Sequence, residues 1–184
     1  MDSTMQDMPL NIRALFRRGE AMFPDSEVIT FEGERARHTR YAVVAERVHR
    51  LAGALRTLGI ASGDRVATLC WNHQEHLETY FAIPCMGAVL HTLNLRLPPN
   101  QLAQIINHAE DRVVIVDDSL APLLAAVIGQ CPSVEHVIVV GSGAVSGRGD
   151  TWAYAVLLAR ESTTLEGPEC GGEGSAGVVV AAGP

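Results

Sequence analysis

The chain has 184 residues, of which 47% are apolar, and its 14 basic and 21 acidic side chains give a formal charge of −7. This length and apolar share predict one globular domain, or one domain plus a fragment, and they exclude an acidic disordered chain. All 14 basic residues are arginines. A Walker-type phosphate loop, a Schiff-base enzyme and a protein kinase are therefore excluded, because each of these depends on a lysine.

The charge is unevenly distributed along the chain. Residues 1–60 hold nine arginines and eight acids, whereas residues 61–184 hold five arginines and thirteen acids. No basic stripe is present, which excludes a nucleic-acid partner. Four widely spaced cysteines argue against a disulfide framework and indicate the reducing cytoplasm, and the N-terminus has no apolar signal segment. The longest uncharged run, residues 79–95, is interrupted by Pro84 and Gly87 and predicts buried core rather than a membrane span.

The first 60 residues predict a helix, a hairpin and a second helix. Asn11 is suited to cap a helix that runs to about Met22, and residues 28–31 and 36–39 flank a turn in the manner of a β-hairpin. From Tyr41 to Leu58, apolar residues recur at helical spacing. Gly59 is placed to end that helix as its C′ residue.

From residue 60 the pattern alternates between strands and helices. The expected strands are residues 65–70, 88–92, 113–116 and 137–140, and the expected helices are 74–86, 99–109 and 120–128. The last two strands are apolar at every position, which is typical of strands covered on both faces. The fold class predicted is therefore α/β: a doubly wound, mostly parallel sheet with flanking helices, preceded by an N-terminal helix and hairpin.

The regular pattern ends after Val140. We expect a glycine-rich loop over residues 141–150, a short helix over 152–159 and a largely unstructured tail over 167–184. This divides the chain into an α/β region, residues 1–160, and a divergent glycine-rich tail, residues 161–184.

Three local patterns are candidates for a functional site. The motif Cys70-x-x-His73-x-x-His76 has the spacing of metal ligands, but no second pair of ligands follows it. We therefore favour the alternative that both histidines lie on the polar side of a helix start. Gly141-x-Gly143-x-x-x-Gly147 follows a strand but lacks the spacing of a dinucleotide fingerprint. The sequence contains no Gly-x-Ser-x-Gly elbow, so a hydrolase has no support.

Asp117 and Asp118 form the third pattern. They end an apolar strand at the edge where doubly wound sheets place functional side chains. The alternative, which is favoured, is that Asp118 or Ser119 caps the next helix.

A longer set of residues is more specific than any of these patterns. It comprises Gly63-Asp64-Arg65-Val66-Ala67, Trp71-Asn72, Glu75-His76-Leu77-Glu78, Tyr80 to Val89 and Leu93-Asn94-Leu95-Arg96-Leu97, with Thr39-Arg40-Tyr41 before it and Val114-Ile115-Val116-Asp117 after it. In this order they resemble the N-terminal part of the AMP-forming acyl-CoA synthetases, within the adenylate-forming superfamily, and most of all the fatty-acid–CoA ligases. The resemblance runs from about Pro9 to Arg160.

The resemblance implies a two-step reaction. A fatty-acid carboxylate attacks the α-phosphate of ATP to give an acyl-adenylate and pyrophosphate, and the thiolate of coenzyme A then displaces AMP. ATP, Mg²⁺ and coenzyme A are the implied cofactors of the complete enzyme. The same resemblance assigns Asn94 and Arg96 to the architecture of a loop after a strand.

The chain departs from the family after Arg160. The family's phosphate loop ends in Lys-Gly, but the expected segment here, residues 162–172, holds glycines and no lysine, and its acids would repel a triphosphate. We therefore expect no catalytic, cofactor-binding or metal-binding residue, and no cofactor bound by this chain alone. The chain is predicted to be an inactive N-terminal fragment of a fatty-acid–CoA ligase, truncated, frame-shifted or excised.

Two alternatives remain open. The chain is an interaction module that completes or regulates a full-length ligase or a separately encoded remainder, or it is a free-standing nucleotide-binding module. A fragment of a doubly wound fold leaves an apolar patch or an open sheet edge. Self-association or docking on a ligase chain is therefore expected.

Overall fold

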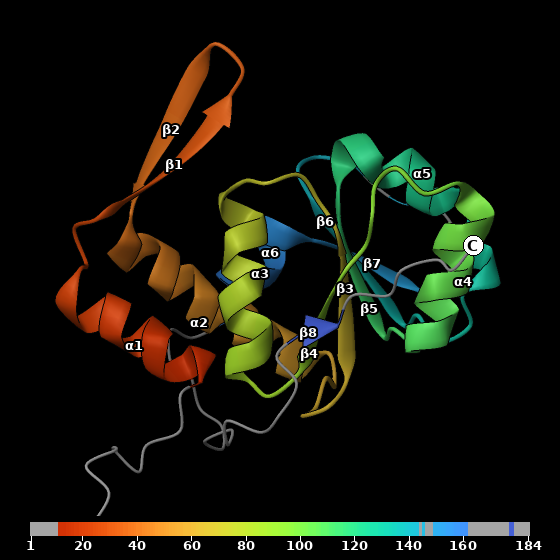
Figure 1. Cartoon of the computed structure of the whole chain (residues 1–184), viewed down its shortest axis with the longest axis horizontal. Coiled ribbons are helices and arrows are strands. Elements are labelled where there is room, and N and C mark those ends of the chain that lie inside the picture. The colour runs from red at the N-terminus through yellow and green to blue at the C-terminus, as the bar shows by residue number, and fades with distance from the viewer. Residues whose placement is uncertain (1–10, 144, 146–148, 162–176, 179–184) are drawn as a thin grey trace, which may run out of the picture.

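A computed structural model describes residues 11–143, 145, 149–161 and 177–178 (Figure 1). Its first part comprises helix α1 (Ile12–Met22), the antiparallel hairpin of β1 (Glu27–Glu32) and β2 (Arg35–Arg40), and helix α2 (Tyr41–Thr57). The Asn11 side chain accepts a hydrogen bond from the Ala14 amide, so the predicted cap is confirmed. The hairpin projects from the rest of the molecule beside α1 and α2.

The described residues contain one six-stranded sheet in the order β7-β6-β5-β3-β4-β8. The strands are β3 (Arg65–Leu69), β4 (Val89–Thr92), β5 (Val113–Asp117), β6 (His136–Val140), β7 (Asp150–Ala153) and β8 (Gly177–Val178), and every neighbouring pair is parallel. Helices α3 (Gln74–Cys85), α4 (Pro99–Ala109), α5 (Ala121–Ala125) and α6 (Tyr154–Ala159) connect or follow the strands. This arrangement confirms the predicted parallel α/β fold.

Two apolar cores cover the two faces of the sheet. Val113 and Ile115 of β5 join a core with α1, α2, α3 and α6, whereas Val114 and Val116 join a core with α4 and α5. Figure 1 shows the same division, with α2 and α3 on one side of the strands and α4 and α5 on the other. Side chains of a strand point alternately to opposite faces, so burial on both faces explains why these strands are apolar at every position.

Two predicted helices have different limits in the structure. Trp152 and Ala153 belong to β7, where they pair with Ile138 and Val139 of β6, so the helix predicted from 152 begins only at Tyr154. The helix predicted over 120–128 is reduced to α5, between 3₁₀ turns at Asp118–Leu120 and Ile128–Gln130. Pairing with a neighbouring strand is a tertiary effect that overrides local helical preference.

The tail contributes one short strand to the described structure. β8 lies beside β4, with Leu90 opposite Gly177 and His91 opposite Val178. The predictions for residues 162–176 and 179–184 lie outside the described residues. No helix in the described part of the chain is both long enough and apolar enough to cross a membrane.

Candidate functional site at the carboxyl edge of the sheet

The loops that follow β3, β5 and β6 meet at the carboxyl edge of the sheet, where they border a hollow of about 540 Å³. The hairpin closes its other side. The described residues that line it are Thr30, Phe31, Glu32, Arg37, Trp71, Asn72, His73, Glu75, Asp117, Asp118, Ser119, Val140 and Gly141. In doubly wound folds, ligands bind at this edge, so the hollow is the candidate site.

Asp117 joins the ends of two neighbouring strands. Its carboxylate is nearly buried and accepts a hydrogen bond from the Trp71 amide at 2.6 Å through Oδ2, while Oδ1 lies 2.7 Å from Nε2 of His73. The loop after β3 is therefore fixed by the last residue of β5. Asp117 thus lies at the sheet edge, as the strand direction predicted, and the contacts seen there hold a neighbouring loop.

The predicted caps are wrong. No side chain caps α5, and neither Asp118 nor Ser119 makes the expected contact. Instead, Asp118 accepts a hydrogen bond from the Ser142 amide at 3.1 Å, and the Ser119 hydroxyl accepts one from the Trp71 indole at 3.1 Å. Asp118 and Ser119 belong to the 3₁₀ turn that precedes α5, and Leu120 occupies the N-cap position, so their side chains stabilise neighbouring loops instead.

Gly141 follows β6 and lies against Asp118. Its φ of 107° is unfavourable for other residues, and a Cβ atom there would collide with the Asp118 carboxylate. The next described element after Gly143 is β7, a strand. Among the described residues, no helix N-terminus that could bind a pyrophosphate directly follows the pattern; Gly147 lies outside them.

His73 is the N-cap of α3 and lies between two carboxylates. Nε2 faces Asp117, and Nδ1 is 3.2 Å from Oε2 of Glu75 and 3.2 Å from the His76 amide nitrogen. Burial disfavours the charged ring, but the hydrogen bonds of Asp117 and Glu75 outweigh this and raise the pKa of His73 to about 9. At neutral pH the ring is charged, so Nδ1–H donates to Glu75; in the neutral ring, Nδ1 can accept from the His76 amide.

Arg37 attaches the hairpin to this group. Its guanidinium donates two hydrogen bonds to Glu75, at 2.8 and 2.9 Å, and a third to Glu32 at 2.8 Å. Burial opposes the charge of Glu75, yet the hydrogen bonds from His73 and Arg37 hold the pKa of this carboxyl well below its usual value. The charged side chains thus alternate in sign from Arg37 through Glu75 and His73 to Asp117. Local sequence gave no signal for Arg37–Glu75, because 38 residues separate the two.

His76 lies elsewhere than predicted. It is 7% exposed, and Nε2 lies 3.1 Å from the Thr68 hydroxyl of β3, so it faces the sheet rather than the polar side of α3. Burial lowers the pKa of His76, as does the nearby charge of His73. Cys70 is also buried, and burial raises the pKa of its thiol. Among the residues that the structure describes, no three or more His, Cys, Asp or Glu side chains are grouped to hold a metal ion.

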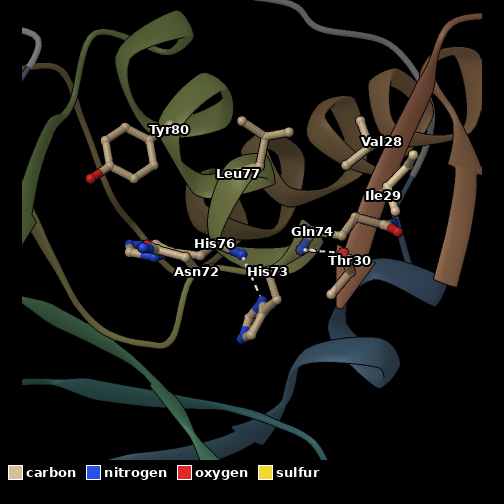
Figure 2. A pocket seen from close by; sticks show the side chains of 9 residues that line it. All are labelled: Val28, Ile29, Thr30, Asn72, His73, Gln74, His76, Leu77 and Tyr80. Carbon is tan, nitrogen blue, oxygen red and sulfur yellow. Dashed lines mark hydrogen bonds between the residues drawn. The ribbon is translucent and has the colours of Figure 1, made fainter. Parts of the chain in front are cut away.

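A second, smaller hollow of about 250 Å³ adjoins the first between β1 and α3 (Figure 2). Val28 and Ile29 face Leu77 and Tyr80 across it. Three residues line both hollows: Thr30, Asn72 and His73. The Thr30 hydroxyl accepts a hydrogen bond from the Gln74 amide at 3.1 Å. The hairpin and the start of α3 therefore form one continuous surface.

The charge at the carboxyl edge does not fit a triphosphate. Of the described residues lining the larger hollow, four are acids (Glu32, Glu75, Asp117 and Asp118), and Arg37 and His73 are basic. Both basic side chains already pair with acids of the same group. ATP at this edge would meet net negative charge, which repels its phosphates.

The loop after β4 has the structure that the resemblance implies. Asn94 accepts a hydrogen bond from the Arg96 amide through its side chain, at 2.9 Å, and from the Leu97 amide through its carbonyl, at 3.2 Å. Such a side-chain bond to the amide two residues ahead forms an Asx turn. Asn94 therefore shapes this loop.

Comparisons with known proteins identify the family. Residues 16–163 of the chain match the family described as AMP-binding enzyme. A long-chain-fatty-acid–CoA ligase from Thermus thermophilus is 46% identical over 169 residues, which cover 91% of this chain and 30% of that protein. A medium-chain-fatty-acid–CoA ligase from Ectopseudomonas oleovorans is 43% identical over 94 residues, covering 51% of this chain and 17% of that protein. The chain spans less than a third of the length of these relatives.

Solved structures show the same fold. The N-terminal domain of FACL13 from Mycobacterium tuberculosis superposes with a TM-score of 0.77 at 24% identity, covering 92% of this chain and 40% of that one. The anthranilate CoA ligase AuaEII, in complex with anthranoyl-AMP, gives a TM-score of 0.79 at 23% identity and covers 93% of this chain and 32% of that one. The chain therefore belongs to the AMP-binding enzyme family, and its fold is shared with part of the N-terminal domain of acyl-CoA ligases.

Proposed function

We propose that this chain is the N-terminal part of an AMP-forming fatty-acid–CoA ligase and that it does not activate a fatty acid by itself. The observation that carries the second statement is that all 14 basic residues are arginines. Formation of an acyl-adenylate builds negative charge on the phosphates, which an enzyme must compensate with fixed positive groups. In the reaction that the family implies, lysines perform this task, and the chain has none.

The structure supports this proposal through the charge of the carboxyl edge. The two basic residues of this edge, Arg37 and His73, are both engaged in ion pairs, with Glu75 and with Asp117. In this proposal, residues 1–160 are the α/β part of the ligase and residues 161–184 are a divergent tail. ATP, Mg²⁺ and coenzyme A are cofactors of the complete enzyme, to which this chain contributes the scaffold at one end of the active site.

Pyrophosphate exchange tests both statements. The purified chain, given a fatty acid, ATP and Mg²⁺, is expected to incorporate no labelled pyrophosphate into ATP. A chimera in which only residues 1–160 of this chain replace the corresponding part of the Thermus thermophilus ligase is expected to catalyse the exchange, because the phosphate loop and everything after it then come from that ligase. Exchange by the chain alone contradicts the inactivity, and a folded but inactive chimera contradicts the assignment as a ligase part.

A second candidate function is an interaction module that completes or regulates a ligase. The observation that favours it is the exposure of large apolar side chains, among them Phe31 at 80% and Trp71 at 54%. Exposed aromatic groups of this kind mark interaction surfaces. Copurification of a second ligase chain from the native source supports this function, and a chain that purifies alone opposes it.

A further inference from the structure

Four exposed apolar side chains gather around the two adjoining hollows. They are Ile29, Phe31, Trp71 and Tyr80, with exposed fractions of 59, 80, 54 and 45%. Ile29 and Tyr80 border the smaller hollow, and Phe31 and Trp71 border the larger one. We name these four residues and the two hollows between them the hairpin face.

The hairpin face is held in a fixed shape. Gln74, at the start of α3, accepts hydrogen bonds from the Thr39 hydroxyl at 2.6 Å and from Arg37 at 3.2 Å, and the two bonds from Arg37 to Glu75 lie beside them. The Trp71 ring is oriented by its bond to Ser119. A preorganised apolar surface loses little conformational entropy when a partner covers it.

Other exposed apolar groups lack this combination. Leu15, Met22 and Phe23 lie along α1 and at its end, and they line neither of the two hollows of the hairpin face. Val43 borders a groove of about 270 Å³ between α2 and α6, but arginines and a glutamate line much of that groove. The hairpin face unites concavity with aromatic side chains, the composition typical of the centre of a protein interface.

We infer that the hairpin face docks on the part of an acyl-CoA ligase that lies outside the region this chain matches. The inference rests on the proposed function. The match covers 91% of this chain but 30% of the Thermus thermophilus ligase, so most of that protein lies outside the matched region and is available to cover this face. Four acids and two basic residues line the larger hollow, so the partner surface is expected to carry basic groups opposite this net negative charge.

A second copy of this chain is a poorer occupant. A symmetric dimer places the same patch of each copy against the other. The negatively charged lining of one copy would then face that of its partner, and each chain has a net charge of −7. Like charges in an interface are unfavourable.

A binding experiment with matched variants tests this inference. The full chain is titrated against the remainder of the Thermus thermophilus ligase, expressed without its matched segment, and the dissociation constant is measured by calorimetry. Phe31→Ser is expected to weaken binding about tenfold or more, because it removes a central aromatic anchor. Phe23→Ser, at a residue 53% exposed at the end of α1, is the control and should change the constant less than about twofold.

Hydrogen exchange provides a second measurement if the remainder does not fold alone. In the chimera described above, residues 27–32 and 71–80 should exchange more slowly than in the isolated chain. The inference is overturned if the remainder does not bind and the exchange rates do not change. It is also overturned if Phe31→Ser and Phe23→Ser change the dissociation constant equally, or if this chain forms a dimer that Phe31→Ser dissociates. An active chimera with no such protection refutes the docking face alone, whereas an inactive chimera with Phe31-dependent binding refutes the proposed function.

Discussion

The Nε2 atom of His73 lies 2.7 Å from Oδ1 of Asp117, and this contact joins the start of α3 to the end of β5. Because Nδ1 is also within 3.2 Å of Glu75, the ring is placed between two carboxylates. These two partners hold the pKa of His73 near 9 although burial opposes it. His73 is therefore a cation at neutral pH. It connects Asp117 of the sheet with Glu75 of α3, the residue that binds Arg37 of the hairpin.

This contact predicts a loss of stability in alkaline solution. The pKa of His73 rises from 6.5 in the unfolded chain to about 9 in the folded one, so its contribution is complete below pH 6.5 and disappears as the pH rises through 9. The full contribution is at most about 3 kcal/mol. Urea unfolding at pH 6, 7.5 and 9 should show the free energy of unfolding falling across this range.

His73→Gln is the matched variant. An amide can still donate to Asp117 but does not titrate, so the variant should be less stable than the wild type at pH 6 and nearly equal to it above pH 9. An equal dependence on pH in both proteins contradicts the role given to His73.

Glu75 should show the opposite dependence. Its pKa is lowered in the folded protein, so its contribution is present above about pH 4.5 and is lost as the pH falls through the folded value. Glu75→Gln should therefore reduce the loss of stability on acidification, measured by thermal unfolding from pH 5 to pH 3. It should also accelerate amide exchange in β1 and β2, because Arg37 loses its charged partner on α3 and keeps only Glu32, which lies within the hairpin. Glu34→Gln, at the hairpin turn, is the control and should leave both measurements unchanged.

The sequence predicted the sheet well because its strands carry a local signal. Val113–Val116 and Val137–Val140 are apolar throughout, and this pattern depends only on burial at both faces of each strand. β7 was missed because its strand character comes from pairing with β6, which no local pattern of Asp150–Ala153 indicates.

The candidate site was predicted in part. Placement of Asp117 at the carboxyl edge followed from strand direction, since parallel strands bring their carboxyl ends together. Its partners, Trp71 and His73, lie 46 and 44 residues away. Spacing cannot specify such pairs, and for the same reason the Arg37–Glu75 contact could not be predicted.

A buried polar group fixes α6 against α2 and α3, and its removal should be costly. Glu78 is fully buried and accepts hydrogen bonds from Arg47 at 2.6 Å, Gln74 at 2.8 Å and Tyr154 at 2.6 Å. Glu78→Ala should lower the free energy of unfolding by about 3–5 kcal/mol, because it leaves Arg47 without its buried partner. Tyr154→Phe should cost about 1–3 kcal/mol.

The two substitutions should not be additive. Once Glu78 is absent, Tyr154→Phe removes no hydrogen bond to it, so the double variant should be little less stable than Glu78→Ala. Glu46→Ala is the control: Glu46 pairs with Arg50 at 2.7 Å on the surface of α2, and its loss should cost less than about 1 kcal/mol. Full additivity in urea unfolding contradicts the coupling.

The Asx turn at Asn94 should contribute to stability as well as to loop shape. Asn94→Ala removes the acceptor of the Arg96 amide and should lower the free energy of unfolding by about 0.5–1 kcal/mol. Gln104→Ala, an exposed amide within α4, is the control and should be neutral or slightly stabilising, since alanine favours helix. A melting temperature unchanged by Asn94→Ala would remove the support for this role.

Millimolar ATP is expected to leave the melting temperature of this chain unchanged. A ligand that binds the folded state at a hundred times its dissociation constant stabilises it by about 2.7 kcal/mol, which calorimetry detects easily. The carboxyl edge carries four acids against Arg37 and His73, and both cations are held by their carboxylate partners, so the phosphates gain no free positive group there. NAD should also be without effect.

The chimera with the Thermus thermophilus ligase should be stabilised by ATP under the same conditions, because it contains the lysines that this chain lacks. A rise in melting temperature for the chain alone would favour the free-standing nucleotide-binding module over the ligase part.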